Sequence, residues 1–220
     1  MFNVKRNIDA PESLAKKNSY SEKDVFEALN KIFHKKCYIC ETKEPLNINI
    51  EHFIPHRGDE DIKYDWENLY LACGRCNNIK LAKFNDLIDC CDDKVDVIRA
   101  IKHLPPHTPY AKELSISAQK TDEKTLTTTK LIQKVFNSTH TINKEVTSSY
   151  LRKNVFYQFN KFRDLQITYF DELTLDEKKQ EALDKMKLLL KASSPYTAFI
   201  SWCVLEDEEL KPLLEDFICN

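Results

Sequence analysis

Hydrophobic residues recur at helical spacing near the N-terminus and through the second half of the chain. Val25, Leu29 and Ile32 share one face of a helix that should begin between Ser21 and Asp24. After about residue 129 the pattern is helical to the C-terminus, with one long apolar stripe made by Leu151, Val155, Phe159, Phe162 and Tyr169. Both ends of the chain are therefore predicted to be helical.

Two local signals predict helix starts in the C-terminal half. Thr174 is followed three residues later by Glu177, which is the spacing of a capping box. Pro195 follows Ser194, and proline suits the first turn of a helix because its missing N–H is not needed there.

Short strands are predicted between the two helical regions. Apolar residues alternate at positions 46, 48 and 50, which favours a strand that ends at Glu51 and His52. The apolar stretch Leu69–Leu71 favours a second strand. Pro55 and the charged run that follows it, up to Asp65, predict a loop between the strands.

The rest of this middle region is predicted from the same patterns. After Gly74 the absence of glycine and proline permits a helix as far as Phe84. A further helix, ended by the proline pair at 105–106, is predicted from the three-residue spacing of Val95, Ile98, Ile101 and Leu104. Alternation at positions 114, 116 and 118 predicts a strand, with a short partner strand around Leu126.

These patterns predict an α+β protein that is mostly helical and has three parts. We expect an N-terminal helical lead-in over residues 1–36, a compact strand–strand–helix module over 37–88 and a mainly helical region over 89–220.

The only glycines are Gly58 and Gly74, so no Gly-rich phosphate loop is possible. The chain should therefore not bind ATP through a P-loop of its own.

Composition predicts a soluble, cytoplasmic protein with no membrane association. No stretch approaches the ~18 consecutive apolar residues of a membrane helix, and the first residues lack the apolar core of a secretory signal. In a reducing compartment, the eight cysteines are expected to be metal ligands or buried thiols rather than disulfides.

Charge is distributed unevenly between the first two parts. Residues 1–40 carry eight Lys and Arg against five Asp and Glu, whereas residues 41–88 carry six basic and nine acidic side chains. An acidic module is a poor surface for a phosphate backbone. If the module acts on nucleic acid, we expect another part or partner to supply affinity.

Two CxxC pairs bracket the module, Cys37 with Cys40 and Cys73 with Cys76. A CxxC turn directs two thiolates at one ion, so two turns complete a closed tetrahedral zinc site that is structural rather than catalytic. We predict one structural Zn²⁺ per chain; the alternative is four ordinary cysteines. Packing thiols are expected at Cys90, Cys91, Cys203 and Cys219.

Several polar residues between the cysteines are not needed by a zinc site. Glu51 and His52 lie at a strand-to-loop bend where both can approach one phosphate, and a neutral imidazole can take a proton from water near neutral pH. Asn77 follows Cys76, and its amide oxygen suits a hard metal ion. The alternative is an inert zinc module with a surface Glu–His dipeptide.

These residues resemble the HNH endonucleases, whose site is a ββα-metal finger. The resemblance covers roughly residues 37 to 84 and rests on the motifs CxxC, EHFIP, WENL and CxxCNxxK in that order. It implies that His52 is the general base, Asn68 the central asparagine and Asn77 the third motif position. It also implies that Glu51 and Asn77 hold one catalytic Mg²⁺ or Mn²⁺.

Four residues in and around this motif have further roles to consider. We interpret Asn68 as a loop anchor that bonds backbone groups. His56, Arg57 and Lys80 are candidate nucleic-acid contacts. The alternatives are a simple loop histidine for His56 and a solvated lysine on a helix face for Lys80.

The segments CYICE, IEHFIP and Tyr64–Leu69, with the helical tail, resemble the HNH subunit of Septu anti-phage systems and its retron-associated relatives. This resemblance implies a DNA endonuclease that assembles with an ABC-type ATPase, with the C-terminal helices as a candidate docking surface. Two alternatives stay open: an RNA nuclease, for example one that attacks tRNA, and a non-catalytic zinc-binding adaptor.

Overall fold

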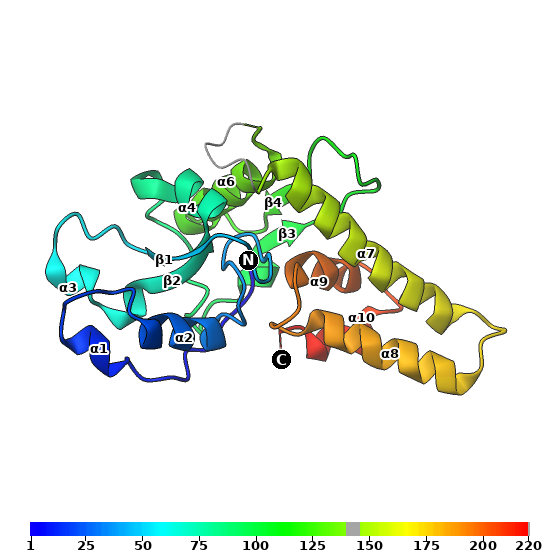
Figure 1. Ribbon diagram of the computed structural model, residues 1–220. Coiled ribbons are helices and arrows are strands. Elements are labelled where there is room, and N and C mark those ends of the chain that lie inside the picture. Colours follow the sequence, from blue (N-terminus) through cyan, green and yellow to red (C-terminus); the bar gives the residue numbers. More distant parts are fainter. Residues whose placement is uncertain (140–145, 220) are drawn as a thin grey trace.

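In a computed structural model, residues 1–139 and 146–219 are described, and they form a mostly helical α+β structure (Figure 1). There are two antiparallel two-stranded sheets in these residues. The first pairs β1 (Ile48–His52) with β2 (Leu69–Cys73), and the second pairs β3 (Ile101–His103) with β4 (Ile116–Ala118). The predicted fold class, mostly helical α+β, is confirmed.

The described helices follow the chain from one end to the other. Those before β3 are α1 (Glu12–Ala15), α2 (Lys23–Ile32), α3 (Glu60–Lys63), the 3₁₀ helix η1 (Trp66–Asn68), α4 (Gly74–Lys80), η2 (Leu81–Lys83) and α5 (Val97–Ala100). Those after β4 are α6 (Glu123–Asn137), α7 (Ser148–Phe170), α8 (Asp176–Leu190), α9 (Thr197–Leu205), α10 (Lys211–Leu214) and η3 (Glu215–Phe217).

The first sheet and α4 form a ββα unit, in the strand, loop, strand, helix order that the sequence predicts. α4 begins directly after β2 and packs against both strands. The strand register pairs Ile48 with Cys73 at one end and His52 with Leu69 at the other. The second cysteine pair and the candidate catalytic histidine therefore lie at opposite ends of this hairpin.

The segments that flank the predicted loop and helix differ in detail from the prediction. The loop between the strands contains α3, which forms because the Asp59 carboxylate accepts hydrogen bonds from the backbone N–H groups of Asp61 and Ile62. α4 ends at Lys80 and not at Phe84, since Leu81 has a positive φ of 41°.

Two predictions between residues 95 and 126 are wrong. The predicted helix that includes Ile101 is only the single turn α5, because Ile101 enters β3 and pairs with Ala118 of β4. The apolar residues at this spacing lie first in the short helix α5 and then in the strand β3, and in both elements they face the core. Leu126 lies in α6 and not in a strand, since the Asp122 side chain caps that helix by accepting from Thr125 N–H.

In the C-terminal half, α7 and α8 form an antiparallel hairpin, and α9 packs against both (Figure 1). Neither predicted helix start is confirmed in detail. The Thr174 hydroxyl donates to Asp171 Oδ2, and Leu175 precedes α8 without capping it through a side chain. α9 begins at Thr197 because Tyr196 adopts the left-handed conformation with φ 56°.

The buried side chains form two clusters. The larger one is continuous through the N-terminal segment, the ββα unit, the second sheet and α6. The smaller one lies among α7 to α10 and consists of Phe162, Met186, Leu190, Ile200, Val204, Leu210 and Leu214. Among the described residues, no helix combines the length and the apolar character that crossing a membrane requires.

Candidate active site and metal centre

The four CxxC cysteines meet at one point in the interior. Cys37 and Cys40 lie in the turn that follows α2, while Cys73 ends β2 and Cys76 lies in the first turn of α4. All four are fully buried, and their sulfur atoms lie within 4.8 Å of one another. Residues separated by more than thirty positions along the chain therefore form one four-thiol cluster.

This cluster fits a zinc ion. Tetrahedral coordination with Zn–S bonds near 2.3 Å places neighbouring sulfurs about 3.8 Å apart. The Sγ atoms of Cys40 and Cys73 are separated by 3.8 Å. Thr42 Oγ1 also lies 3.2 Å from Cys40 Sγ, which gives this sulfur a hydrogen-bonding neighbour outside the cluster. Four thiolates occupy all four coordination positions of a tetrahedral zinc ion. A zinc ion bound here would therefore stabilise the fold and would have no open position for a water molecule or a substrate.

The other cysteines are separate from this cluster. Cys90 is buried and Cys91 half-buried; their sulfurs and a carboxylate oxygen of Asp89 also lie within 4.8 Å of one another. Cys203 and Cys219 are half-buried and belong to no such group among the described residues.

At the opposite end of the β1–β2 hairpin, a cavity of about 380 Å³ collects the residues predicted for catalysis. Glu51 and His52 reach it from the end of β1, and Asn77 reaches it from α4. The other residues that line it include His56, Arg57, Lys80 and Tyr20. The ββα unit thus brings together Glu51, His52, Asn77 and Lys80, and Tyr20 reaches the same cavity from the N-terminal segment.

His52 is held in one orientation. Its Nε2 lies 3.0 Å from the carbonyl oxygen of Lys63, and a carbonyl only accepts, so Nε2 carries a proton. Burial lowers the pKa of His52 below its ordinary value, which favours the neutral imidazole. The Nδ1 atom has no hydrogen-bond partner among the described residues and keeps its lone pair. His52 therefore has the arrangement of a general base.

Asn68 fixes the loop that supplies this carbonyl. Its Oδ1 accepts from Ile54 N–H at 2.7 Å, and its Nδ2 donates to the carbonyl oxygens of Ile54 and Ile62 at 2.9 and 3.0 Å. The side chain is 5% exposed and makes contacts only with backbone groups in these bonds. The loop from residue 54 to 62 is therefore tied to the start of β2, next to Lys63.

Glu51 is buried and hydrogen-bonded through both oxygens. Tyr38 O–H donates to Oε1 at 2.5 Å, and Lys80 Nζ donates to Oε2 at 3.1 Å. Burial raises the pKa of the Glu51 carboxyl, while the Lys80 ammonium and these hydrogen bonds oppose the rise. Each carboxylate oxygen has a second lone pair, so a metal ion can still bind.

Asn77 is the second candidate ligand. It is half-buried, lines the same cavity, and its side-chain amide has no hydrogen-bond partner among the described residues. Apart from the two cysteine-containing groups, no set of three His, Cys, Asp or Glu ligands converges in the described part of the chain. A cation here would be held by Glu51, Asn77 and water, which suits Mg²⁺ and Mn²⁺ because they bind oxygen ligands.

The three predicted nucleic-acid contacts differ in their surroundings. His56 stacks at a tilt on His52 with ring centroids 4.7 Å apart, and Arg57 is exposed at the rim of the cavity. Lys80 is only 1% exposed, so it is not a solvated helix-face lysine. Its ammonium donates to Glu51 and to the carbonyl oxygens of His52 and Phe53, which uses all three of its hydrogens.

Three residues of the site were missed in the sequence. Tyr38, which lies between the first two cysteines, holds Glu51, and the Lys63 carbonyl holds His52. Tyr20 packs edge-on against the His52 ring at 4.7 Å from the N-terminal segment. The EHFIP pattern does not indicate any of them. Lys63 acts through its backbone carbonyl and Tyr20 through its ring, while Tyr38 lies inside the CxxC motif, in which only the cysteines suggest a role.

Comparison with known proteins identifies the class of this site. Residues 37–83 match the family model for HNH endonuclease. The matched range includes both cysteine pairs, His52, Asn68 and Asn77, so the match covers the zinc cluster and the candidate catalytic residues together. Neither a search of curated proteins nor a search of solved structures found a match.

Proposed function

We propose that this protein is a metal-dependent endonuclease that hydrolyses phosphodiester bonds in DNA. The observation that carries the proposal is the orientation of His52. Its Nε2 is held by the Lys63 carbonyl, its Nδ1 has no hydrogen-bond partner in the described part of the chain, and the side chain lines a cavity shared with Glu51 and Asn77. A zinc module without catalysis has no use for a half-buried, oriented imidazole beside a carboxylate.

In the proposed reaction His52 is the general base. Its Nδ1 takes a proton from a water molecule as that water attacks phosphorus, and the Lys63 carbonyl stabilises the imidazolium that results, because the Nε2–H bond to it persists. Asn68 acts as a positioning residue, since it holds the loop that carries this carbonyl. His56 and Arg57 line the cavity where the phosphate would lie.

Glu51 and Asn77 would hold one Mg²⁺ or Mn²⁺ ion in this site. A hard divalent cation bound there supplies electrostatic stabilisation of the charge that develops on the phosphate and the departing oxygen. Lys80 donates to Glu51 Oε2 and fixes this carboxylate in place, and its positive charge opposes the rise in the pKa of Glu51 that burial causes.

The biological setting is proposed from the sequence resemblance. The chain would act as the nuclease of a Septu-like anti-phage system, in an assembly with an ABC-type ATPase. The acidic balance of residues 41–88 supports a dependence on a partner for nucleic-acid affinity.

The test mixes the purified full chain with supercoiled plasmid DNA and with total RNA, each with and without the ATPase, in Mg²⁺ or Mn²⁺. Nicking or linearisation of the plasmid supports the proposal. Degradation of RNA alone would assign the same site to RNA, and no cleavage of either substrate with the ATPase present would favour the zinc-binding adaptor.

A further inference from the structure

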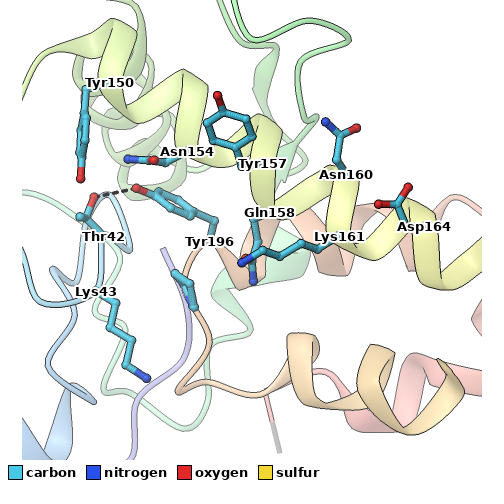
Figure 2. Close-up of a pocket in the computed structure, with 11 residues that line it drawn as sticks. Thr42, Lys43, Tyr150, Asn154, Tyr157, Gln158, Asn160, Lys161, Asp164 and Tyr196 are labelled. Carbon is cyan, nitrogen blue, oxygen red and sulfur yellow. Dashed lines mark hydrogen bonds between the residues drawn. The ribbon is translucent and has the colours of Figure 1, made fainter. Parts of the chain in front are cut away.

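A second cavity, of about 620 Å³, lies beside the zinc cluster and away from His52. One wall is a single face of α7, with Tyr150, Asn154, Tyr157 and Lys161 at successive helical turns (Figure 2). The opposite wall comes from two distant segments, residues 42–43 and residues 195–196. We refer to this cavity as the α7 groove.

The groove contains a polar group that is open to a ligand. Gln158 lines it and is only 6% exposed as a residue, and its side-chain amide makes no hydrogen bond within the described residues. Its amide atoms are not among the fully buried atoms without a partner, so they reach the groove and can pair with water or with a bound ligand. The amide presents both a donor and an acceptor, which is what the edge of a nucleobase requires.

Aromatic rings and positively charged side chains also line the groove. Tyr150 and Tyr157 are 47% and 48% exposed, although large aromatic side chains usually bury most of their surface. The ammonium of Lys153 lies 5.7 Å from the centre of the Tyr157 ring, and Lys43 and Lys161 line the groove with one acidic residue, Asp164. The surface is therefore aromatic, rich in amides and positively charged on balance.

One wall is also held under backbone strain. Tyr196 is a non-glycine residue with φ 56°, and its hydroxyl lies 3.1 Å from Thr42 Oγ1, the same atom that contacts zinc-cluster Cys40 (Figure 2). Strained residues persist where the surroundings enforce them, and they concentrate at binding sites. Thr42 thus joins the wall of the α7 groove to the zinc cluster.

We propose that the α7 groove binds a nucleotide unit, with its base on Tyr157 and Gln158 and its phosphate at Lys161. Lys161 is one helical turn from Tyr157, about 6 Å along the axis, which suits the offset between a base and its phosphate. Stacking on tyrosine tolerates any base, whereas the ammoniums select the phosphate. The unit comes from a free nucleotide or from a single strand.

The experiment measures binding to the full, zinc-loaded chain in the His52→Ala background without Mg²⁺, so that cleavage plays no part. The probes are AMP, followed by calorimetry, and fluorescently labelled twelve-residue single strands of DNA and RNA, followed by anisotropy. The variants are Tyr157→Ala, Gln158→Leu and Lys161→Gln. Tyr110→Ala and Lys130→Gln are matched controls, because both side chains are exposed and lie outside the groove.

We expect Tyr157→Ala to weaken binding at least about fivefold, since stacking of one base is worth about 1–3 kcal/mol. Gln158→Leu should weaken binding through lost hydrogen bonds to the base, and Lys161→Gln through the lost charge at the phosphate. The controls should leave binding unchanged. Tight binding of AMP would identify a free nucleotide as the source, and binding of the strands alone would identify a nucleic-acid strand. Absence of binding to every probe, or equal binding by Tyr157→Ala and Tyr110→Ala, would overturn the proposal. Because cleavage is not measured, failure here is distinct from failure of the nuclease assay.

Discussion

The ammonium of Lys80 lies 3.1 Å from Glu51 Oε2, and the two side chains are only 1% and 4% exposed. The same ammonium donates to the carbonyl oxygens of His52 and Phe53. One lysine on α4 therefore fixes both the candidate metal ligand and the backbone at the end of β1. The ββα unit depends on this buried contact as well as on the zinc cluster.

Replacing Lys80 by methionine should lower the free energy of unfolding by about 3–5 kcal/mol. Breaking a buried ion pair leaves the Glu51 carboxylate without its counter-charge, which is the costly outcome. Lys83→Met is the matched control, since Lys83 is exposed three residues further on, and it should change the value by less than about 0.5 kcal/mol. Urea denaturation measures both; equal stabilities would show that Lys80 does not brace Glu51.

Cys73→Ala should abolish zinc binding and loosen the whole ββα unit. The metal replaces core that so short a unit cannot build, so its binding energy is folding energy. Wild-type protein should contain one zinc ion per chain by mass spectrometry under native conditions. Cys203→Ala should keep the zinc, because that thiol lies outside the cluster. Zinc retained by the Cys73 variant would contradict the four-thiolate assignment.

Asn68→Ala should disorder the loop that orients His52. It removes three hydrogen bonds to backbone groups, which should cost about 2–3 kcal/mol of stability. Nitrogen NMR should show the Nε2–H tautomer of His52 in the wild type and a mixture of tautomers in the variant. Asn78→Ala, an exposed neighbour of Asn77, is the control. An unchanged tautomer in Asn68→Ala would contradict the anchoring role.

The pH dependence of stability should contain a large contribution from His103. Burial, together with the Met1 ammonium, lowers the pKa of His103 to about 3, while Glu41 opposes the shift. The native state then binds fewer protons at this residue than the unfolded chain between pH 6.5 and 3. Stability should therefore fall as pH decreases through this window.

The slope attributable to His103 is at most about 1.4 kcal/mol per pH unit. His103→Phe should remove this component, because phenylalanine fills a similar space and does not titrate. Urea denaturation at pH 7, 6 and 5 compares the two proteins. Parallel profiles for wild type and variant would show that His103 is not the group responsible.

The parts of the structure that local patterns control could be predicted from the sequence. The CxxC spacing predicts the four-thiol cluster, and the alternation before Glu51 predicts β1, because ligand geometry and strand period are encoded by nearby residues. Ile101 was misassigned, since its spacing fits a helix until Ala118 pairs with it. A distant partner decided its conformation.

The missed contacts have the same origin. On a helical wheel Lys80 is an ordinary lysine, and only the packing of α4 against β1 shows that it is buried beside Glu51. The α7 groove likewise combines residues near 42, 158 and 196, which no periodicity connects. Contacts between segments far apart in sequence are set by the tertiary structure, so single-sequence patterns do not contain them.

DNA cleavage by wild-type and His52→Ala proteins, in Mg²⁺ and with the ATPase present, is the most direct test of the proposed nuclease. We predict that His52→Ala lowers the cleavage rate at least about 100-fold, the lower range for loss of a general base. His107→Ala, an exposed histidine outside the site, should cleave like the wild type, and all three proteins should retain zinc. Metal-dependent cleavage that persists in His52→Ala would contradict the assignment of His52 as the general base.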